Sequence, residues 1–188
     1  MKVGEDVLAR ARSLPSSDSN GQDQSDEVTR LMVQALRQKG AVLVGLVFPH
    51  EKPLLSAFGH SFVDVSKGLE CLKEAASLAQ TSCAVRMRSG KQAFRKLGDA
   101  HASQGNWLSA EQAYCWAEEA FDEMWATLTD DQQRRTCREL FLPRMLGCSR
   151  QRVLLKAHQE KDAFLVGENS RARALAILLA QAMPRSNE

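Results

Sequence analysis

The chain has 188 residues, of which 44% are hydrophobic and 26% are charged, proportions that suit one globular domain with a buried core. The formal net charge of +2 gives no strong overall attraction to nucleic acid or to an anionic membrane. No apolar run approaches the roughly 18 residues of a membrane span, and the start MKVGEDVLARARS lacks the apolar core of a secretory signal. We therefore expect an intracellular, cytoplasmic protein with no membrane contact.

The N-terminal region is predicted to be a flexible segment over residues 1–27. Residues 14–27 are mainly Ser, Asp, Gln and Asn, a composition that cannot bury enough apolar surface to offset the entropy lost on ordering. A single helical domain is expected over residues 28–184, followed by a polar tail over residues 185–188.

The first helix is predicted over residues 26–39, with Gly40 at its end. Residues 41–48 (AVLVGLVF) then have the composition of a buried strand. No other segment offers a strand partner, and a lone strand would leave its backbone groups without hydrogen bonds. We therefore expect a buried helical turn or an extended core segment there.

A helical pattern follows over residues 54–80, weakened at Gly68. Asp64 or Ser66 is the expected N-cap of a second helical start within it, because a short polar side chain can accept a hydrogen bond from a free backbone amide. This helix lies just ahead of the clearest pattern in the chain, so it is a candidate second helix of a preceding hairpin.

The most informative pattern lies in residues 91–124, where small and large apolar residues recur at spacings typical of two antiparallel helices, 84–103 and 107–128. Gly98 removes a side chain at the expected closest approach, at about 1 kcal/mol relative to Ala. Ala110 is expected opposite it, and Gly105 is expected in the turn. The residues predicted to pack in this hairpin are Phe94, Leu97, Gly98, Gly105, Trp107, Ala110, Tyr114 and Ala117.

This spacing resembles the tetratricopeptide repeat, a helix–turn–helix unit of about 34 residues that stacks into solenoids. Leu97-Gly98 matches the Leu-Gly pair of that family's first helix, and Trp107 takes the aromatic position after the turn. Two residues depart from the pattern. His101 stands where the family prefers an aromatic residue, and Asp122 stands where a closing proline is usual.

The resemblance implies an all-α protein of stacked antiparallel helical hairpins, a fragment of an α-solenoid that serves as an adaptor or scaffold for another protein. In that family the first helix of each repeat lines the inner groove. The outward positions there are Gln92, Arg95, Asp99 and Ser103, and we expect them to contact a peptide or helix of the partner. They do not match the Lys and Asn set with which some family members hold a terminal carboxylate.

Beyond the motif, Thr129 and Gln132 have the form of a capping box, and the helix that they begin is expected to stop or kink at Pro143. Gly147 is expected to give another break, followed by a helix capped by Ser149. Residues 167–170 are expected to form a loop before a strongly apolar last helix over residues 171–183.

A single helical repeat cannot bury its own apolar face, and roughly three are needed for stability. Three explanations remain open. The flanking helices are degenerate repeats, the chain is a piece of a longer array, or a partner completes the core. Helical patterns on both sides of residues 91–124 favour the first. The oligomeric state stays open.

Charges are segregated along the chain. Residues 107–132 contain acidic residues but no Lys or Arg, whereas the following segment is rich in Arg, including Arg150. This pattern predicts either ion pairs between adjacent stacked helices or a solvated acidic face. An alternative function for the Arg-rich region is binding of RNA or a phosphorylated partner, because the guanidinium fork matches phosphate. No nucleic-acid motif supports that alternative.

A second alternative is a small helical enzyme, but no glycine-rich phosphate loop, G-x-S-x-G elbow or H-E-x-x-H motif is present in the sequence. The five cysteines form no C-x-x-C pair, and the four histidines have no metal-ligand spacing. We therefore expect no catalytic residues, no metal and no cofactor. The three tryptophans recur every nine residues, which predicts packing between neighbouring helices rather than a ligand-binding box.

Overall fold

The computed structural model describes residues 21–45, 64–82, 85–127 and 143–182. Every regular element within these ranges is helical. They are α2 (Gly21–Leu43), α4 (Val65–Gln80), the π-helical turn η2 (Arg86–Gly90), α6 (Lys91–Ser103), α7 (Trp107–Thr127), α9 (Pro143–Lys156) and α10 (Glu160–Ala182).

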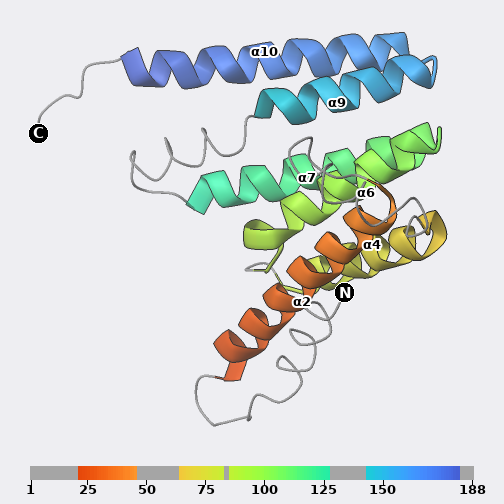
Figure 1. The fold of residues 1–188 in the computed structure, drawn as a ribbon. Coiled ribbons are helices and arrows are strands. Elements are labelled where there is room, and N and C mark those ends of the chain that lie inside the picture. The colour runs from red at the N-terminus through yellow and green to blue at the C-terminus, as the bar shows by residue number, and fades with distance from the viewer. Residues whose placement is uncertain (1–20, 46–63, 83–84, 128–142, 183–188) are drawn as a thin grey trace, which may run out of the picture.

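The helices form three antiparallel pairs, α2 with α4, α6 with α7 and α9 with α10, which follow one another along a stack (Figure 1). Neighbouring pairs are joined by packing of α4 against α6 and of α7 against α9. The predicted all-α fold of stacked antiparallel hairpins is therefore confirmed, with a helical pair on each side of the predicted central hairpin.

The α2–α4 pair crosses at two glycines. A Cβ placed on Gly40 would lie 2.8 Å from the Gly68 carbonyl oxygen and 2.7 Å from Leu72 Cγ, and a Cβ on Gly68 would lie 2.5 Å from Val44 Cγ2. The sequence-based prediction that Gly40 ends the first helix is wrong, since α2 continues to Leu43. Gly68 likewise lies inside α4. The close packing that it allows against α2 outweighs the low helix propensity of glycine.

The N-terminal boundary of the domain also differs from the prediction. α2 begins at Gly21, so residues 21–27 are helical rather than part of a flexible segment, whereas residues 1–20 lie outside the described ranges. The Arg30 guanidinium donates hydrogen bonds to the Glu27 carboxylate, and Thr29 Oγ1 donates to the Ser25 carbonyl at 2.8 Å. Once the packed part of α2 has nucleated, each added residue gains a backbone hydrogen bond without needing apolar burial.

The α9–α10 pair contains two further glycines at close approaches. A Cβ on Gly147 would collide with Ser170 Oγ, and one on Gly167 would lie 2.7 Å from Gln151 Nε2. The break predicted at Gly147 and the loop predicted over residues 167–170 are therefore wrong. Both glycines lie within continuous helices because they let α9 and α10 approach each other.

Other helix boundaries follow recognised signals. Asp64 caps α4, as predicted, since its Oδ1 accepts a hydrogen bond from the Lys67 backbone amide at 3.0 Å. Pro143 is the first residue of α9, a position where a missing amide hydrogen costs nothing. The helix expected to stop or kink at Pro143 would precede it, in residues outside the described ranges. Ser149 lies inside α9 rather than at its start. The capping box at Thr129 and residues 46–53 lie outside the described ranges.

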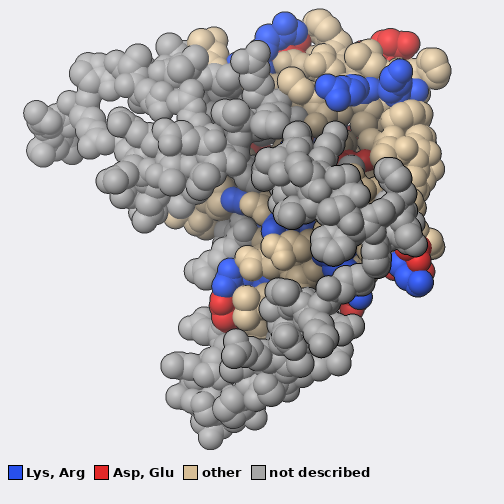
Figure 2. All heavy atoms as spheres, in the orientation of Figure 1, with Lys and Arg blue, Asp and Glu red and all other residues tan. Residues whose placement is uncertain are grey.

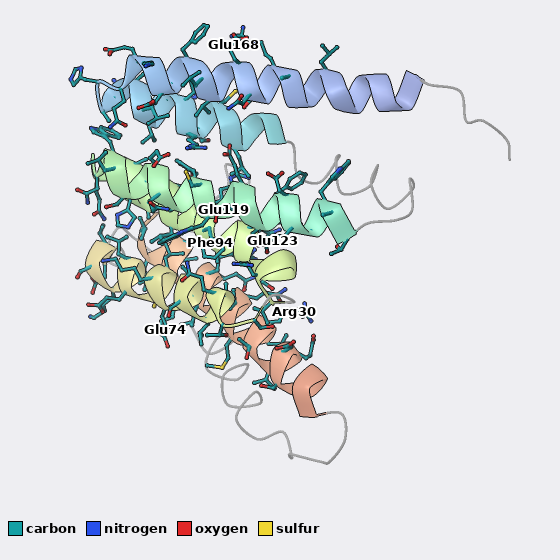
Figure 3. All side chains as sticks on the ribbon, turned by 180° about the vertical axis from the view of Figure 1, so that it is seen from behind. Arg30, Glu74, Phe94, Glu119, Glu123 and Glu168 are labelled. Carbon is teal, nitrogen blue, oxygen red and sulfur yellow. The ribbon has the colours of Figure 1, made fainter. Side chains whose placement is uncertain are left out.

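The main core runs through the stack around Phe94, which is fully buried in the middle of the molecule (Figure 3). Trp107, Trp116 and Trp125 pack against this core while partly exposed, which confirms the predicted packing role. The ring centroids of Phe94 and Trp116 lie 5.9 Å apart, a distance at which aromatic pairs are favourable.

Candidate protein-interaction surface

The central hairpin, α6–α7, turns through three residues, Gln104, Gly105 and Asn106. Gly105 has a φ of 75°, in the left-handed region that glycine adopts without strain. The Asn106 carbonyl accepts a hydrogen bond from the Ala110 backbone amide at 3.0 Å, and the Asn106 side-chain amide donates one to Gln104 Oε1 at 3.3 Å. The predicted turn is therefore confirmed, and its shortness forces the two helices to run antiparallel and in contact.

The two helices meet most closely at Gly98. A Cβ there would lie 2.7 Å from Tyr114 Cε1 and 2.8 Å from Tyr114 Cδ1, closer than carbon atoms pack. Ala110, the expected partner of Gly98, is fully buried, and the atoms nearest to a Cβ built on Gly98 belong to the Tyr114 ring. The hairpin is therefore closed beside Gly98 by an aromatic ring lying on a bare backbone.

The remaining predicted packing residues are distributed as a hairpin requires. The buried ones share one face of each helix, Trp107 is half-buried, and Gly105 is exposed in the turn. The buried set comprises Phe94, Leu97, Gly98, Ala110, Tyr114 and Ala117.

The predicted groove residues form a single outward stripe on α6, since they recur at intervals of three and four. Gln92 and Ser103 are exposed, and Arg95 and Asp99 are partly exposed. Ser103 Oγ donates to the Ala100 carbonyl at 2.8 Å, which leaves its oxygen lone pairs available to a partner. The structure brings all four residues onto one surface, but their role in binding stays a prediction.

Asp99 also has a structural role that the sequence did not predict. The Tyr114 hydroxyl donates a hydrogen bond to Asp99 Oδ1 at 2.7 Å, which links α6 to α7 beside the Gly98 contact. Burial, the Asp99 charge and this hydrogen bond all raise the pKa of Tyr114. Asp99 is therefore an unsuitable residue for testing partner binding, because its replacement would also disturb the hairpin.

His101 replaces the aromatic residue expected at its position and lies on the buried side of α6 with 9% of its surface exposed. Its Nδ1 is buried and makes no hydrogen bond. Burial lowers the pKa of the imidazole, and the nearby positive charge of Lys73 on α4 lowers it further. The side chain thus acts as a neutral packing residue between α4 and α6 at neutral pH.

Arg150 of α9 joins two carboxylates of α7 and so holds the last two pairs together. Its Nε donates to Glu111 Oε1 and its Nη1 to Glu118 Oε2, both at 2.9 Å. All three side chains are mostly buried, with 16–26% of their surfaces exposed. Arg86 similarly pairs with Glu123 at 2.5 Å, next to the start of α6. The predicted ion pairing between adjacent helices is confirmed for these residues.

Cys115 belongs to the same network. Its thiol donates to Glu111 Oε1 at 3.0 Å, and burial together with that carboxylate raises the pKa of Cys115 to about 12. Burial also raises the pKa of Cys71. A nucleophilic cysteine needs a lowered pKa, so neither thiol has the environment of a catalytic residue.

The polar surroundings of η2 were missed by the sequence reasoning. Ser89 is 3% exposed, and its hydroxyl makes no hydrogen bond, while Arg86 Nε and Glu123 Oε2 are also buried without one. A π-helical turn often marks a functional position, but its register depends on tertiary packing and leaves no signal in the sequence. A bridging water would satisfy atoms of this kind.

Charges of both signs are interspersed over the described part of the face shown in Figure 2. Across the residues that the structure describes, no group of three or more His, Cys, Asp or Glu side chains is placed to hold a metal ion. None of the described helices is long and apolar enough to cross a membrane. Comparison with protein families, curated proteins and solved structures finds no match for the chain.

Proposed function

We propose that the chain is a non-enzymatic adaptor whose tetratricopeptide-like hairpins hold another protein, with the α6 stripe as the contact surface. The observation that carries the proposal is the α6–α7 hairpin itself, in which Gly98 and Tyr114 close two helices joined by a three-residue turn. Such hairpins supply extended surfaces for holding partner chains and have no reaction chemistry of their own.

The order of the pairs supports the same proposal. The α2–α4 and α9–α10 pairs flank the central hairpin, as degenerate repeats would. Each pair has a glycine at a close approach of its two helices, at Gly40, Gly98 and Gly147 respectively. Stacking of this kind buries a continuous core between neighbouring units and leaves one side of each first helix for a ligand.

The outward stripe of α6 suits a peptide or helix with polar and charged groups. Gln92 and Ser103 offer hydrogen-bonding groups at its two ends, and Arg95 supplies a positive charge between them. A partner segment with an acidic residue opposite Arg95 would fit this order. Because the stripe is polar, it would confer orientation and specificity more than raw affinity.

Two arginines that would serve the phosphate-binding alternative are already engaged. Arg150 binds Glu111 and Glu118, and Arg86 binds Glu123, so their positive charge is largely neutralised within the fold. The raised pKa of Cys115 argues in the same way against the enzyme alternative. A protein partner therefore remains the best supported ligand.

Site-specific photo-crosslinking tests the proposal. A benzophenone amino acid is placed in turn at Gln92, Ser103, Glu74 and Glu119, the last two being exposed positions on α4 and α7 that serve as controls (Figure 3). We expect a discrete protein adduct in cell extract at Gln92 and Ser103 only. Once identified, the purified partner should bind Arg95→Glu at least about tenfold more weakly than wild type, since each tenfold loss corresponds to about 1.4 kcal/mol.

Two results would overturn the proposal. Adducts that form equally at Glu74 and Glu119 would show that the α6 stripe is not the contact surface. Adducts that disappear after nuclease treatment, with binding that falls steeply as salt increases, would favour the nucleic-acid alternative instead.

A further inference from the structure

The last helix, α10, has two different faces. Ala163, Val166 and Gly167 face α9, where the first two form a small buried cluster with Leu154 that is separate from the main core. The opposite face is exposed and mixes charged residues with three large apolar ones. The apolar ones are Phe164, Leu165 and Leu175, with 61%, 49% and 58% of their surfaces exposed.

Three exposed large apolar residues on one helix stand out in this protein. Among the residues whose side chains the structure describes, the other exposed large hydrophobic residues are spread over four helices, at Val42, Val65, Leu108 and Leu155. Large apolar residues that stay exposed on one helix, with polar residues around them, point to an interaction site. The outer face of α10 is therefore the strongest candidate for a contact with another molecule outside α6.

Two charged residues lie between Phe164 and Leu165 on one side and Leu175 on the other. Glu168 and Arg171 form an ion pair one helical turn apart, and both side chains are largely exposed, at 47% and 70%. Figure 3 shows Glu168 on the side of α10 that turns away from α9. Exposed ion pairs within one helix stabilise it only weakly, so either partner can exchange for a group on another molecule at little cost.

The order of residues along this face is self-complementary. Phe164 and Leu165 precede the charged pair by about the same distance as Leu175 follows it. If a second α10 lies antiparallel across the first, with a two-fold axis between residues 169 and 170, then Phe164 and Leu165 meet Leu175 of the partner subunit. In the same register Glu168 meets Arg171 of the partner subunit, and Arg171 meets the partner subunit's Glu168.

We propose that this face binds a second copy of the chain, so that two molecules associate through an antiparallel α10–α10 contact. A two-fold contact requires one patch to complement itself, and an acidic and a basic residue placed symmetrically about the axis meet that requirement. Parallel alignment would instead place Glu168 beside Glu168 of the partner subunit. The contact covers the apolar residues that the small α9–α10 core leaves exposed.

Sedimentation equilibrium of the full chain, over about 1 to 100 µM, tests the proposal because micromolar association is measurable in that range. We expect a reversible monomer–dimer equilibrium for wild type. Glu168→Arg alone, or Arg171→Glu alone, should weaken dimerisation at least tenfold, since each places four like charges at the axis. The double variant Glu168→Arg/Arg171→Glu should dimerise within about threefold of wild type, because the complementarity returns with the signs exchanged.

A mixing experiment sharpens the test. Glu168→Arg and Arg171→Glu are each expected to be monomeric alone, but mixed in equal amounts they should form a heterodimer, since one then carries two positive and the other two negative charges at the axis. Glu119→Arg, an exposed charge reversal on α7, is the control and should dimerise like wild type. Circular dichroism should show unchanged helix content for every variant.

Three results would overturn the proposal. Wild type could remain monomeric at every concentration, which would assign the α10 face to some other partner. Dimerisation could persist in both single variants, which would place the interface elsewhere. The single variants could fail to associate when mixed, which would exclude the antiparallel register.

Discussion

The ring of Tyr114 occupies the space that a side chain at Gly98 would need, with Cε1 2.7 Å and Cδ1 2.8 Å from the position of a Cβ there. The missing side chain at Gly98 thereby lets a ring of α7 lie against the backbone of α6. The neighbouring carboxylate of Asp99 accepts a hydrogen bond from the Tyr114 hydroxyl. The Tyr114 side chain is therefore held by packing at its ring and by a hydrogen bond at its hydroxyl.

Gly98→Ala should destabilise the protein although alanine favours helices. The added methyl group overpacks the Tyr114 contact at about 1–3 kcal/mol, against a gain in helix propensity of about 1 kcal/mol. We expect a net loss of up to about 2 kcal/mol in the free energy of unfolding, measured by urea denaturation. In the Tyr114→Ala background the obstacle is gone, so the same substitution should be neutral or stabilising. A loss of equal size in both backgrounds would show that the contact is not the cause.

Tyr114 offers a spectroscopic test because it is the only tyrosine in the sequence. Its raised pKa means that the phenol should stay protonated above pH 10, the ordinary value for tyrosine. We expect no tyrosinate absorbance near 295 nm at pH 10.5 while circular dichroism still reports a folded protein. Titration at the ordinary value in the folded state would contradict the buried hydrogen bond to Asp99.

Arg150→Met should loosen the junction between α7 and α9. Removing the guanidinium leaves two mostly buried carboxylates unpaired, and breaking a partly buried network of this kind costs about 2–4 kcal/mol. Amide exchange in α9 and α10 should increase more than in α2 and α4, because α9 and α10 are attached to the rest of the stack through the α7–α9 junction. Lys67→Met breaks an exposed pair with Asp64 and should change stability much less than Arg150→Met does. Equal effects of the two substitutions would argue against a buried network at Arg150.

His101 should make the protein less stable in mild acid. Its pKa is lowered in the folded state, whereas the unfolded side chain has the ordinary value of 6.5. The unfolded state therefore takes up a proton first, and folded stability is lost as the pH falls below about 6.5. The thermal midpoint of wild type should drop between pH 7 and pH 5.5, and His101→Phe should reduce that drop. A variant with an unchanged pH dependence would assign the effect to another group.

The central hairpin was predictable because its determinants are local. Leu97-Gly98, the turn at Gly105 and the apolar stripe that includes Tyr114 all lie within one short stretch of chain, so the spacing alone predicts two helices that meet. The stripe of Gln92, Arg95, Asp99 and Ser103 followed from the same periodicity. The hydrogen bond from Tyr114 to Asp99 did not, since it depends on how the two helices rotate against each other.

The flanking pairs were harder to predict because their determinants are distant in sequence. Gly40 and Gly68 touch each other's helices across an intervening segment, and Gly147 and Gly167 meet α10 and α9 in the same way. Taken alone, a glycine inside a helical pattern indicates a break, since it costs about 1 kcal/mol relative to alanine. Only the packed structure shows that each of these glycines allows a close approach.

The contact between Tyr114 and Gly98 can be observed directly by nuclear Overhauser spectroscopy on protein labelled selectively at tyrosine and glycine. The ring protons of Tyr114 should show strong cross-peaks to the α-protons of Gly98, because the ring lies against that backbone. Strong Tyr114 cross-peaks to the α-protons of a different glycine, with none to Gly98, would contradict the hairpin and remove the basis for an adaptor function.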